Sequence, residues 1–308
     1  MINFRYHLVS IAAIMLALAA GVALGSGPLD DAGSALSGGG DQSSATTDPA
    51  TASFESAYAA RTATPLLKGA LKGKSVVVIT LPGASAADSK SISTLLVQAD
   101  AQVTGQIELT SKLLNSANRQ FAEGVAQQAA ADVPGVTAAG DSYTRIGSAL
   151  GRSILASKNS AIDPTATTIQ SAFVEGDLVT LTAKPTKLAT LAVVVTGPKT
   201  SGSGDQGDVV AAMVGALDTT GKGVVVAGPA SSSTDGGIVK AVRDSDASSN
   251  VSTVDVSGIA AGRVVVVLAI AKEATGQSGS WGTARSSDGG VPNLSLIHIL
   301  TLPTIYSV

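Results

Sequence analysis

The chain has 308 residues, of which 44% are hydrophobic, 14% are charged and only 3% are aromatic. A composition so apolar and so poor in charge excludes an intrinsically disordered chain, and the formal net charge of −3 leaves no basic excess for a nucleic-acid partner. The absence of cysteine excludes disulfides, thiol nucleophiles and zinc fingers.

Residues 1–27 are predicted to form an N-terminal transmembrane helix. Arg5 precedes a run without charge from Leu8 to Gly25, close to the roughly 20 apolar residues that a spanning helix needs. Acidic residues follow the run, so the body of the chain is expected outside the cytoplasmic membrane. A cleavable signal peptide is the alternative, because Ala17-Leu18-Ala19 has the small-x-small form of a cleavage site. The apolar positions of the segment are Leu8, Ile11, Ile14, Leu16, Leu18, Val22 and Leu24.

Small residues recur within this segment at every fourth position. Ala17, Gly21 and Gly25 would lie on one face of a helix, where they could pack against another helix. A general alanine and glycine bias of the chain explains the same spacing more simply.

Residues 28–64 are predicted to be a flexible tether. They are rich in Gly, Ser, Ala, Thr and Asp, which is typical of linkers, and a short helix is expected near residues 54–61.

Residues 65–290 are predicted to form an α/β body of two related βαβ units, about 65–185 and 186–290, around a largely parallel, Rossmann-like sheet. The strands are expected as continuous apolar runs covered on both faces, and the helices as segments with apolar residues at i, i+3, i+4 and i+7. Ser85 and Asp88 have the spacing of a capping box at the start of the first helix. The expected strands are 74–80, 102–109, 191–196, 223–227, 251–256 and 263–269, and the expected helices are 85–99, 119–132, 144–157, 165–174, 210–217 and 238–242.

No catalytic or cofactor-binding residue is predicted in this body. Residues 202–207 match G-x-G-x-x-G at the start of a helix, but residues 197–201 separate the motif from its strand and no acidic residue ends the next strand. A flexible surface loop is therefore the preferred interpretation. The two histidines, His7 and His298, lie outside the body, which leaves no base for a Ser-His-Asp arrangement.

Metal coordination is not expected in the body either. Met213 is its one soft ligand, and the spacing places this residue on the core face of a helix. Asp244 and Asp246 fall in a polar stretch and are expected to be solvated rather than a carboxylate dyad. Trp281 is the single tryptophan of the chain, and a packing anchor is favoured over a platform for a ligand.

Residues 291–308 differ abruptly from the Gly, Ser and Ala-rich sequence before them. The stretch from Leu294 onward resembles translated sequencing-adaptor read-through, so we exclude it from reasoning about sites. A genuine C-terminal strand and a membrane-touching end are the alternatives.

Over about residues 1–285 the sequence resembles the actinobacterial copper transport outer-membrane family, MctB. The resemblance rests on 5–27, on 73–79 and 193–197, and on the C-terminal stretches Ser252–Asp255, Gly262–Ala269 and Gly279–Gly282. The chain departs from the family pattern in two places. A Gly/Ser tether stands where a charged coiled-coil segment is usual, which puts oligomerisation through that segment in doubt, and Trp281 stands where tyrosine is usual.

The resemblance implies copper efflux or copper homeostasis at the cell envelope, with an outer-membrane location and a role in a channel. It also implies that the partners of the chain are a membrane and either further copies of the chain or an envelope protein. Copper is expected as a partner from the resemblance alone. The alternative is a membrane-anchored scaffold for septal cell separation, without transport or catalysis of its own. An enzyme is disfavoured, because the sequence offers neither a base nor a cofactor loop.

Overall fold

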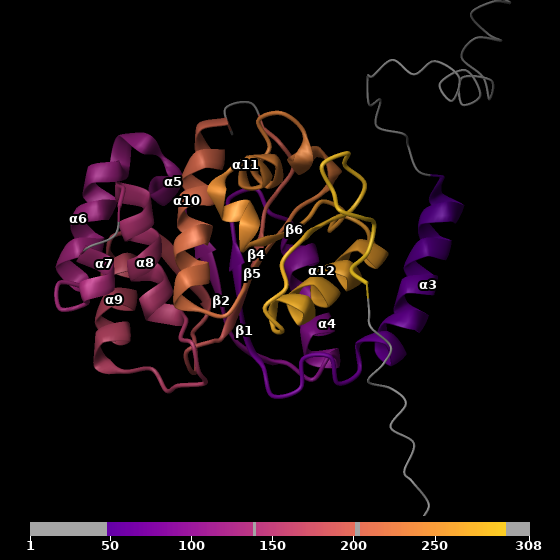
Figure 1. The fold of residues 1–308 in the computed structure, drawn as a ribbon, viewed down its shortest axis with the longest axis horizontal. Coiled ribbons are helices and arrows are strands. Elements are labelled where there is room, and N and C mark those ends of the chain that lie inside the picture. Colours follow the sequence, from indigo (N-terminus) through magenta and orange to yellow (C-terminus); the bar gives the residue numbers. More distant parts are fainter. Residues whose placement is uncertain (1–47, 138–139, 201–203, 294–308) are drawn as a thin grey trace, which may run out of the picture. The chain divides into compact units, whose positions relative to one another are not determined.

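A computed structural model describes residues 48–137, 140–200 and 204–293 (Figure 1). The predicted membrane segment, including its apolar positions and the small residues Ala17, Gly21 and Gly25, lies outside these residues. So do His7 and the tail from Leu294 onward.

A seven-stranded sheet forms the centre of the body, in the order β3-β2-β1-β4-β5-β6-β7. Every neighbouring pair is parallel except β2 and β3, which are antiparallel, so the sheet is mixed. The strand order reverses between β1 and β4. The strands are β1 (Ser75–Thr80), β2 (Gln102–Leu109), β3 (Val179–Ala183), β4 (Leu191–Val195), β5 (Val224–Ala227), β6 (Ser252–Val254) and β7 (Ser280–Trp281).

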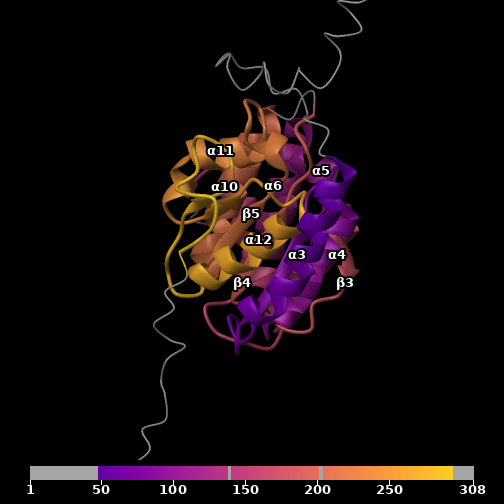
Figure 2. The same cartoon turned by 90° about the vertical axis from the view of Figure 1, so that its right-hand side faces the viewer.

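Helices cover both faces of this sheet (Figure 1). On one face lie α5 (Ser111–Leu114), α6 (Arg119–Ala129), α7 (Pro134–Thr137), α8 (Ser142–Ile154), α9 (Pro164–Glu175), α10 (Gly204–Thr220) and α11 (Ile238–Asp244). On the other lie α3 (Pro49–Leu67), α4 (Ala86–Gln98) and α12 (Ala260–Glu273), the layer that faces the viewer in Figure 2. Short 3-10 turns occupy connections at Ser116–Asn118, Ala230–Ser233 and Asp246–Ser249.

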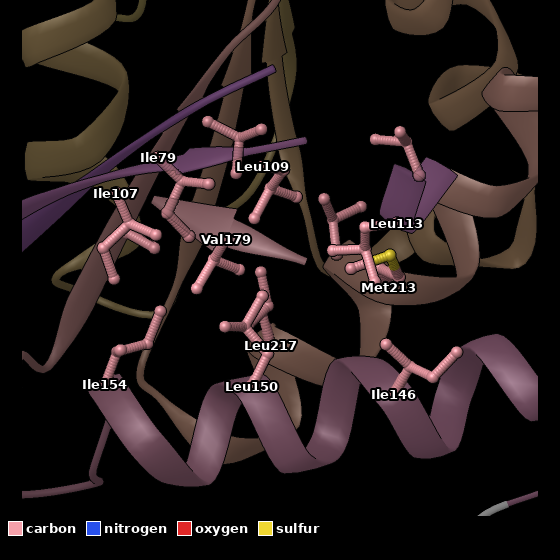
Figure 3. Packing of buried hydrophobic residues seen from close by; sticks show 14 of the residues in the cluster. Ile79, Ile107, Leu109, Leu113, Ile146, Leu150, Ile154, Val179, Met213 and Leu217 are labelled. Carbon is pink, nitrogen blue, oxygen red and sulfur yellow. The ribbon is translucent and has the colours of Figure 1, made fainter. Parts of the chain in front are cut away.

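Burial of every residue explains why the central strands have uninterrupted apolar sequences. All residues of β4 and β5 are buried, and alternate side chains enter two separate apolar clusters, one on each face. Figure 3 shows one of these clusters, in which Ile79 and Ile107 of the sheet lie over Ile154 of α8. Met213 of α10 points into the same cluster, as its spacing predicts.

The run 263–269 is helical, so the strand predicted there is wrong. It forms most of α12, whose residues Val264–Ile270 are all buried between the sheet and the neighbouring helices. A helix buried on every side carries the same unbroken apolar run as a buried strand, and periodicity cannot separate the two. The sheet uses β7 as its next strand instead.

The prediction of a membrane helix followed by a largely parallel sheet of two βαβ units also needs correction. The antiparallel β3 makes the sheet mixed, and β1 pairs directly with β4, so the expected halves share one sheet. Within the described ranges, no helix combines the length and the apolar character that crossing a membrane requires. The segment predicted to span lies outside those ranges.

Helix α3 occupies the second part of the stretch expected to be a tether. It is considerably longer than the short helix expected near residues 54–61. Ala59, Ala63 and Leu67 are buried on it, and the backbone N–H of Ala261 donates to the Glu55 carboxylate at the first turn of α12. The helix is therefore fixed to the body by apolar contact and by a cap.

Candidate functional site

Doubly wound sheets commonly bind ligands beyond the carboxyl ends of the strands, at the point where the strand order reverses. In this protein that point lies between the loops that follow β1 and β4. Gly83, with φ +81°, presents its carbonyl oxygen to Gly197, where a Cβ atom would overlap that oxygen. The two loops thus meet backbone to backbone at Gly83 and Gly197, where the crevice is expected.

A buried ion pair lies farther along the same edge of the sheet. Asp255 directly follows β6 and Arg243 belongs to α11, with Arg243 Nη1 and Asp255 Oδ2 2.8 Å apart. The Asp255 side chain is 0% exposed and the Arg243 side chain is 3% exposed. Withdrawal of both charges from water is costly unless hydrogen bonds replace the hydration.

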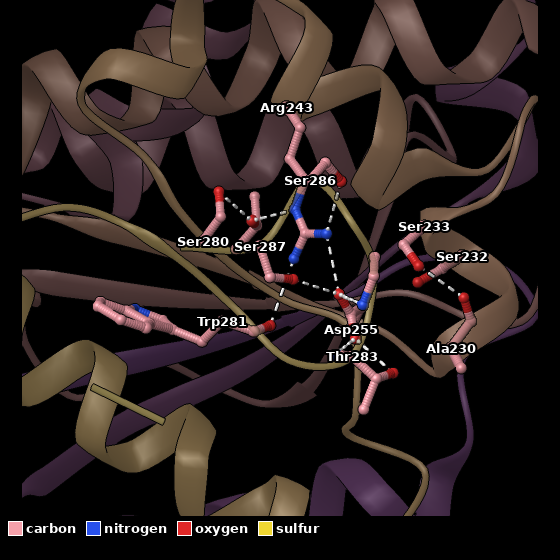
Figure 4. A network of polar contacts seen from close by, with 12 residues as sticks. Ala230, Ser232, Ser233, Arg243, Asp255, Ser280, Trp281, Thr283, Ser286 and Ser287 are labelled. Carbon is pink, nitrogen blue, oxygen red and sulfur yellow. Dashed lines mark hydrogen bonds and ion pairs between the residues drawn. The ribbon is translucent and has the colours of Figure 1, made fainter. Parts of the chain in front are cut away.

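Hydrogen bonds from one segment satisfy the Asp255 carboxylate (Figure 4). The backbone N–H of Thr283 donates to Oδ1 at 2.8 Å, and the Ser287 hydroxyl donates to Oδ2 at 3.0 Å. Ala284 adds a longer backbone bond of 3.3 Å. All of these donors belong to residues 279–290, which we call the C-terminal strap. Asp255 therefore holds the strap against the carboxyl edge.

The Arg243 guanidinium is satisfied in the same way (Figure 4). Its Nε donates to Thr253 Oγ1 at 2.8 Å, and its Nη1 to Ser286 Oγ at 3.1 Å. Nη2 donates to the Trp281 carbonyl at 3.3 Å. One arginine thus connects α11, β6 and the strap, and the pair acts as a structural anchor.

Glycine is required where the strap turns over this pair. Gly282 has φ +135°, and a Cβ atom on it would overlap the Asp255 carboxylate. The stretches Ser252–Asp255 and Gly279–Gly282, which carried part of the family resemblance, therefore meet in space. Their spacing serves the packing of the strap.

A second ion pair ties two helices together near the same edge. Arg263, in the first turn of α12, donates to Asp88 at 2.9 Å and to the Ser257 carbonyl at 3.3 Å. Ser85 caps α4 as expected, since its hydroxyl accepts from the Asp88 N–H at 3.2 Å. The Asp88 carboxylate, however, pairs with Arg263.

The structure places the remaining predicted residues as follows. The G-x-G-x-x-G stretch lies only partly within the described residues, because 201–203 fall outside them. Asp244 pairs with Lys240 at 2.7 Å on the surface, and Asp246 begins a short 3-10 turn. Trp281 forms part of β7 and packs against the apolar cluster that contains α12.

The donor set of the described residues does not suit copper. They contain no His and no Cys, and Met213, whose sulfur is the soft donor, is buried at 1% exposure. Nor do His, Cys, Asp or Glu side chains cluster in threes anywhere in these ranges in a way that could hold a metal ion.

Fold and edge together define a class: a doubly wound α/β protein whose two switch-point loops are in backbone contact and whose carboxyl edge carries a buried ion pair. Residues 1–292 match the family model described as "Copper transport outer membrane protein, MctB". The chain belongs to that family.

Curated relatives agree with this assignment. Proteins named copper transporter MctB from Mycobacterium bovis and Mycobacterium tuberculosis are each 32% identical to the chain, over 88% of it and 92% of their own length. The protein of that name from Mycobacterium leprae is 28% identical with the same coverage.

Sequence reasoning missed the residues that organise this edge. Arg243 lies in a polar stretch, and nothing local indicates that it faces a carboxylate twelve positions later in the chain. Gly83 and Gly197 belong to different βαβ units, so their contact becomes visible only with the strand order. The one signal in the sequence was that Asp255 and Gly282 both lie in stretches that resemble the family.

Proposed function

We propose that the chain takes part in copper efflux or copper homeostasis at the cell envelope as a non-catalytic protein whose body does not itself coordinate the metal. The family description and the names of the relatives support the copper-related role and the envelope location. The observation that carries the rest is the close packing at the carboxyl edge, where Gly83 meets Gly197 and Asp255 meets Arg243.

Copper passage would then depend on an oligomer or on an envelope partner. Thiolate and thioether sulfurs are the preferred ligands of Cu(I) and imidazole suits copper in general, and these are the donors that the described body lacks or buries. The same inventory argues against an enzyme, because the described residues include no histidine or cysteine to act as a base or nucleophile.

An envelope scaffold for cell separation is the second candidate. Phe54 and Tyr58 of α3 favour it, since their rings stack at 6.2 Å between centroids and stay 71% and 61% exposed. Aromatic residues are enriched at protein–protein interfaces relative to the rest of the surface.

A deletion strain scored in two ways separates the candidates. Raised intracellular copper under copper stress with normal division supports the copper role and removes the scaffold. Normal copper handling with chained, unseparated cells removes the copper role. Complementation with a Phe54→Ser, Tyr58→Ser double variant then reports whether the exposed face of α3 is needed, and Ser56→Ala on the same helix is the matched control.

A further inference from the structure

The amino edge of the sheet, opposite the edge described above, contains a buried carboxyl group. Glu273, the last residue of α12, is 3% exposed, and its Oε1 accepts from the backbone N–H of Ser252 at 2.7 Å. No ion pair reaches Glu273 from any residue that the structure describes. A buried carboxylate without a cation is costly in its charged form.

Close backbone packing seals this group from water. Gly223, at the entrance to β5, has φ +153°, and a Cβ atom there would lie 2.6 Å from Glu273 Cβ and 2.9 Å from its Oε2. Glycine is thus required both by its conformation and by the proximity of the carboxyl group.

The charged groups around Glu273 do not offset its charge. Asp218 on α10 is itself a partly buried carboxyl and repels it. Lys74, before β1, donates to the Ala274 carbonyl at 3.4 Å. Lys272, on the same helix, donates to Gln277 at 3.0 Å, and Lys222, beside Gly223, is exposed. Burial first, and the charge of Asp218 to a smaller extent, raise the pKa of Glu273 from 4.5 to about 7.

We propose that Glu273 is a pH-sensitive latch between α12 and β6: the protonated group keeps this junction closed, and ionisation favours its opening. The junction is connected to the C-terminal strap. Ser252 Oγ accepts from the Gly279 N–H at 3.0 Å, and the Thr253 N–H donates to the Gly279 carbonyl at 3.0 Å. Opening at Ser252 therefore also loosens the beginning of the strap.

The sign of the pH dependence follows from proton linkage. The closed junction binds the Glu273 proton more tightly than the open one, so the stabilisation is complete at acid pH and is lost as the pH rises toward the pKa of the closed state. The opening equilibrium should increase about tenfold per pH unit between about pH 5 and 6.5, and it should level off above about pH 7.

Hydrogen–deuterium exchange of the full chain tests the latch. We would follow peptides covering 250–256 and 277–282 between pH 5 and 8.5, with rates corrected for intrinsic exchange. The wild type should lose protection in these peptides with rising pH, whereas Glu273→Gln, which cannot ionise, should have a flat profile. Asp218→Asn should shift the levelling-off to lower pH, and Asp244→Asn, at an exposed ion pair, should follow the wild type.

A flat wild-type profile, or an unchanged pH dependence in Glu273→Gln, would overturn the proposal. If Glu273→Gln does not fold, Asp218→Asn decides alone: a shift to lower pH supports the latch, and an unshifted profile rejects it.

Discussion

At the carboxyl edge of the sheet, Asp255 and Arg243 are buried together and share hydrogen bonds with one strap, whereas at the amino edge Glu273 is buried without a cation. Both edges hold the same C-terminal region. A buried charge stabilises the fold when a counter-charge and hydrogen-bond donors take the place of its hydration. A buried carboxyl group without a counter-charge makes the stability of the same fold depend on pH.

Removal of one partner of the Asp255–Arg243 ion pair should have the largest effect on stability. Asp255→Ala leaves Arg243 buried without its counter-charge and frees the strap, so we expect a loss of about 3–5 kcal/mol in the free energy of unfolding. Urea denaturation followed by circular dichroism measures it.

Asp244→Ala provides the matched control, because Asp244 pairs with Lys240 at an exposed position. Its cost should stay below about 1 kcal/mol. Equal effects of the two substitutions would remove the distinction between a buried anchor and a surface pair.

Removal of the charge of Glu273 at the amino edge should have the opposite effect and stabilise the protein. Glu273→Gln keeps an acceptor for the Ser252 N–H and removes the charge, so it should stabilise the protein by up to about 3 kcal/mol at pH 8 and by little at pH 5. Thermal unfolding at both pH values tests this prediction. A variant that is less stable than the wild type at pH 8 would show that the charge is compensated.

The contact between Gly83 and Gly197 should make an added methyl group at this point destabilising. Gly197→Ala places a methyl group against the Gly83 carbonyl and should cost about 1–2 kcal/mol through displacement of the two loops. Gly124→Ala on α6, where the added Cβ meets open space, should instead stabilise by about 0.5–1 kcal/mol. Chemical denaturation of both variants decides, and a neutral Gly197→Ala would mean that the crevice can open at little cost.

Much of the sheet was predictable from the sequence, because its central strands are unbroken valine-rich runs. The expected bounds of β2 agree with the structure, and those of β4 and β5 differ by one residue. The same reasoning failed at 263–269, since full burial removes the amphipathic period that distinguishes a helix. It also missed β3, for which no strand was predicted and which runs antiparallel to β2.

The arrangement of side chains at the two edges of the sheet was harder to predict from the sequence. The anchor depends on Arg243 of α11 meeting Asp255 at the carboxyl edge of the sheet. The latch depends on Glu273 at the end of a helix whose sequence predicts a strand. The buried environment of each group comes from elements distant in sequence. The expectation that the body holds no copper site rests on its residue types, which can be counted without knowing the fold.

Copper titration of the full-length protein tests most directly whether the body contributes to copper handling without coordinating the metal. The variant His7→Ala, Met15→Leu, His298→Ala removes both histidines and one of the two methionines outside the described residues, where Met1 remains, and it leaves the body intact. Calorimetry with Cu(I) and Cu(II) should then show no saturable binding at micromolar or tighter affinity. A stoichiometric site that persists in this variant and is lost when Met213→Leu is added would place copper in the body and contradict the proposed function.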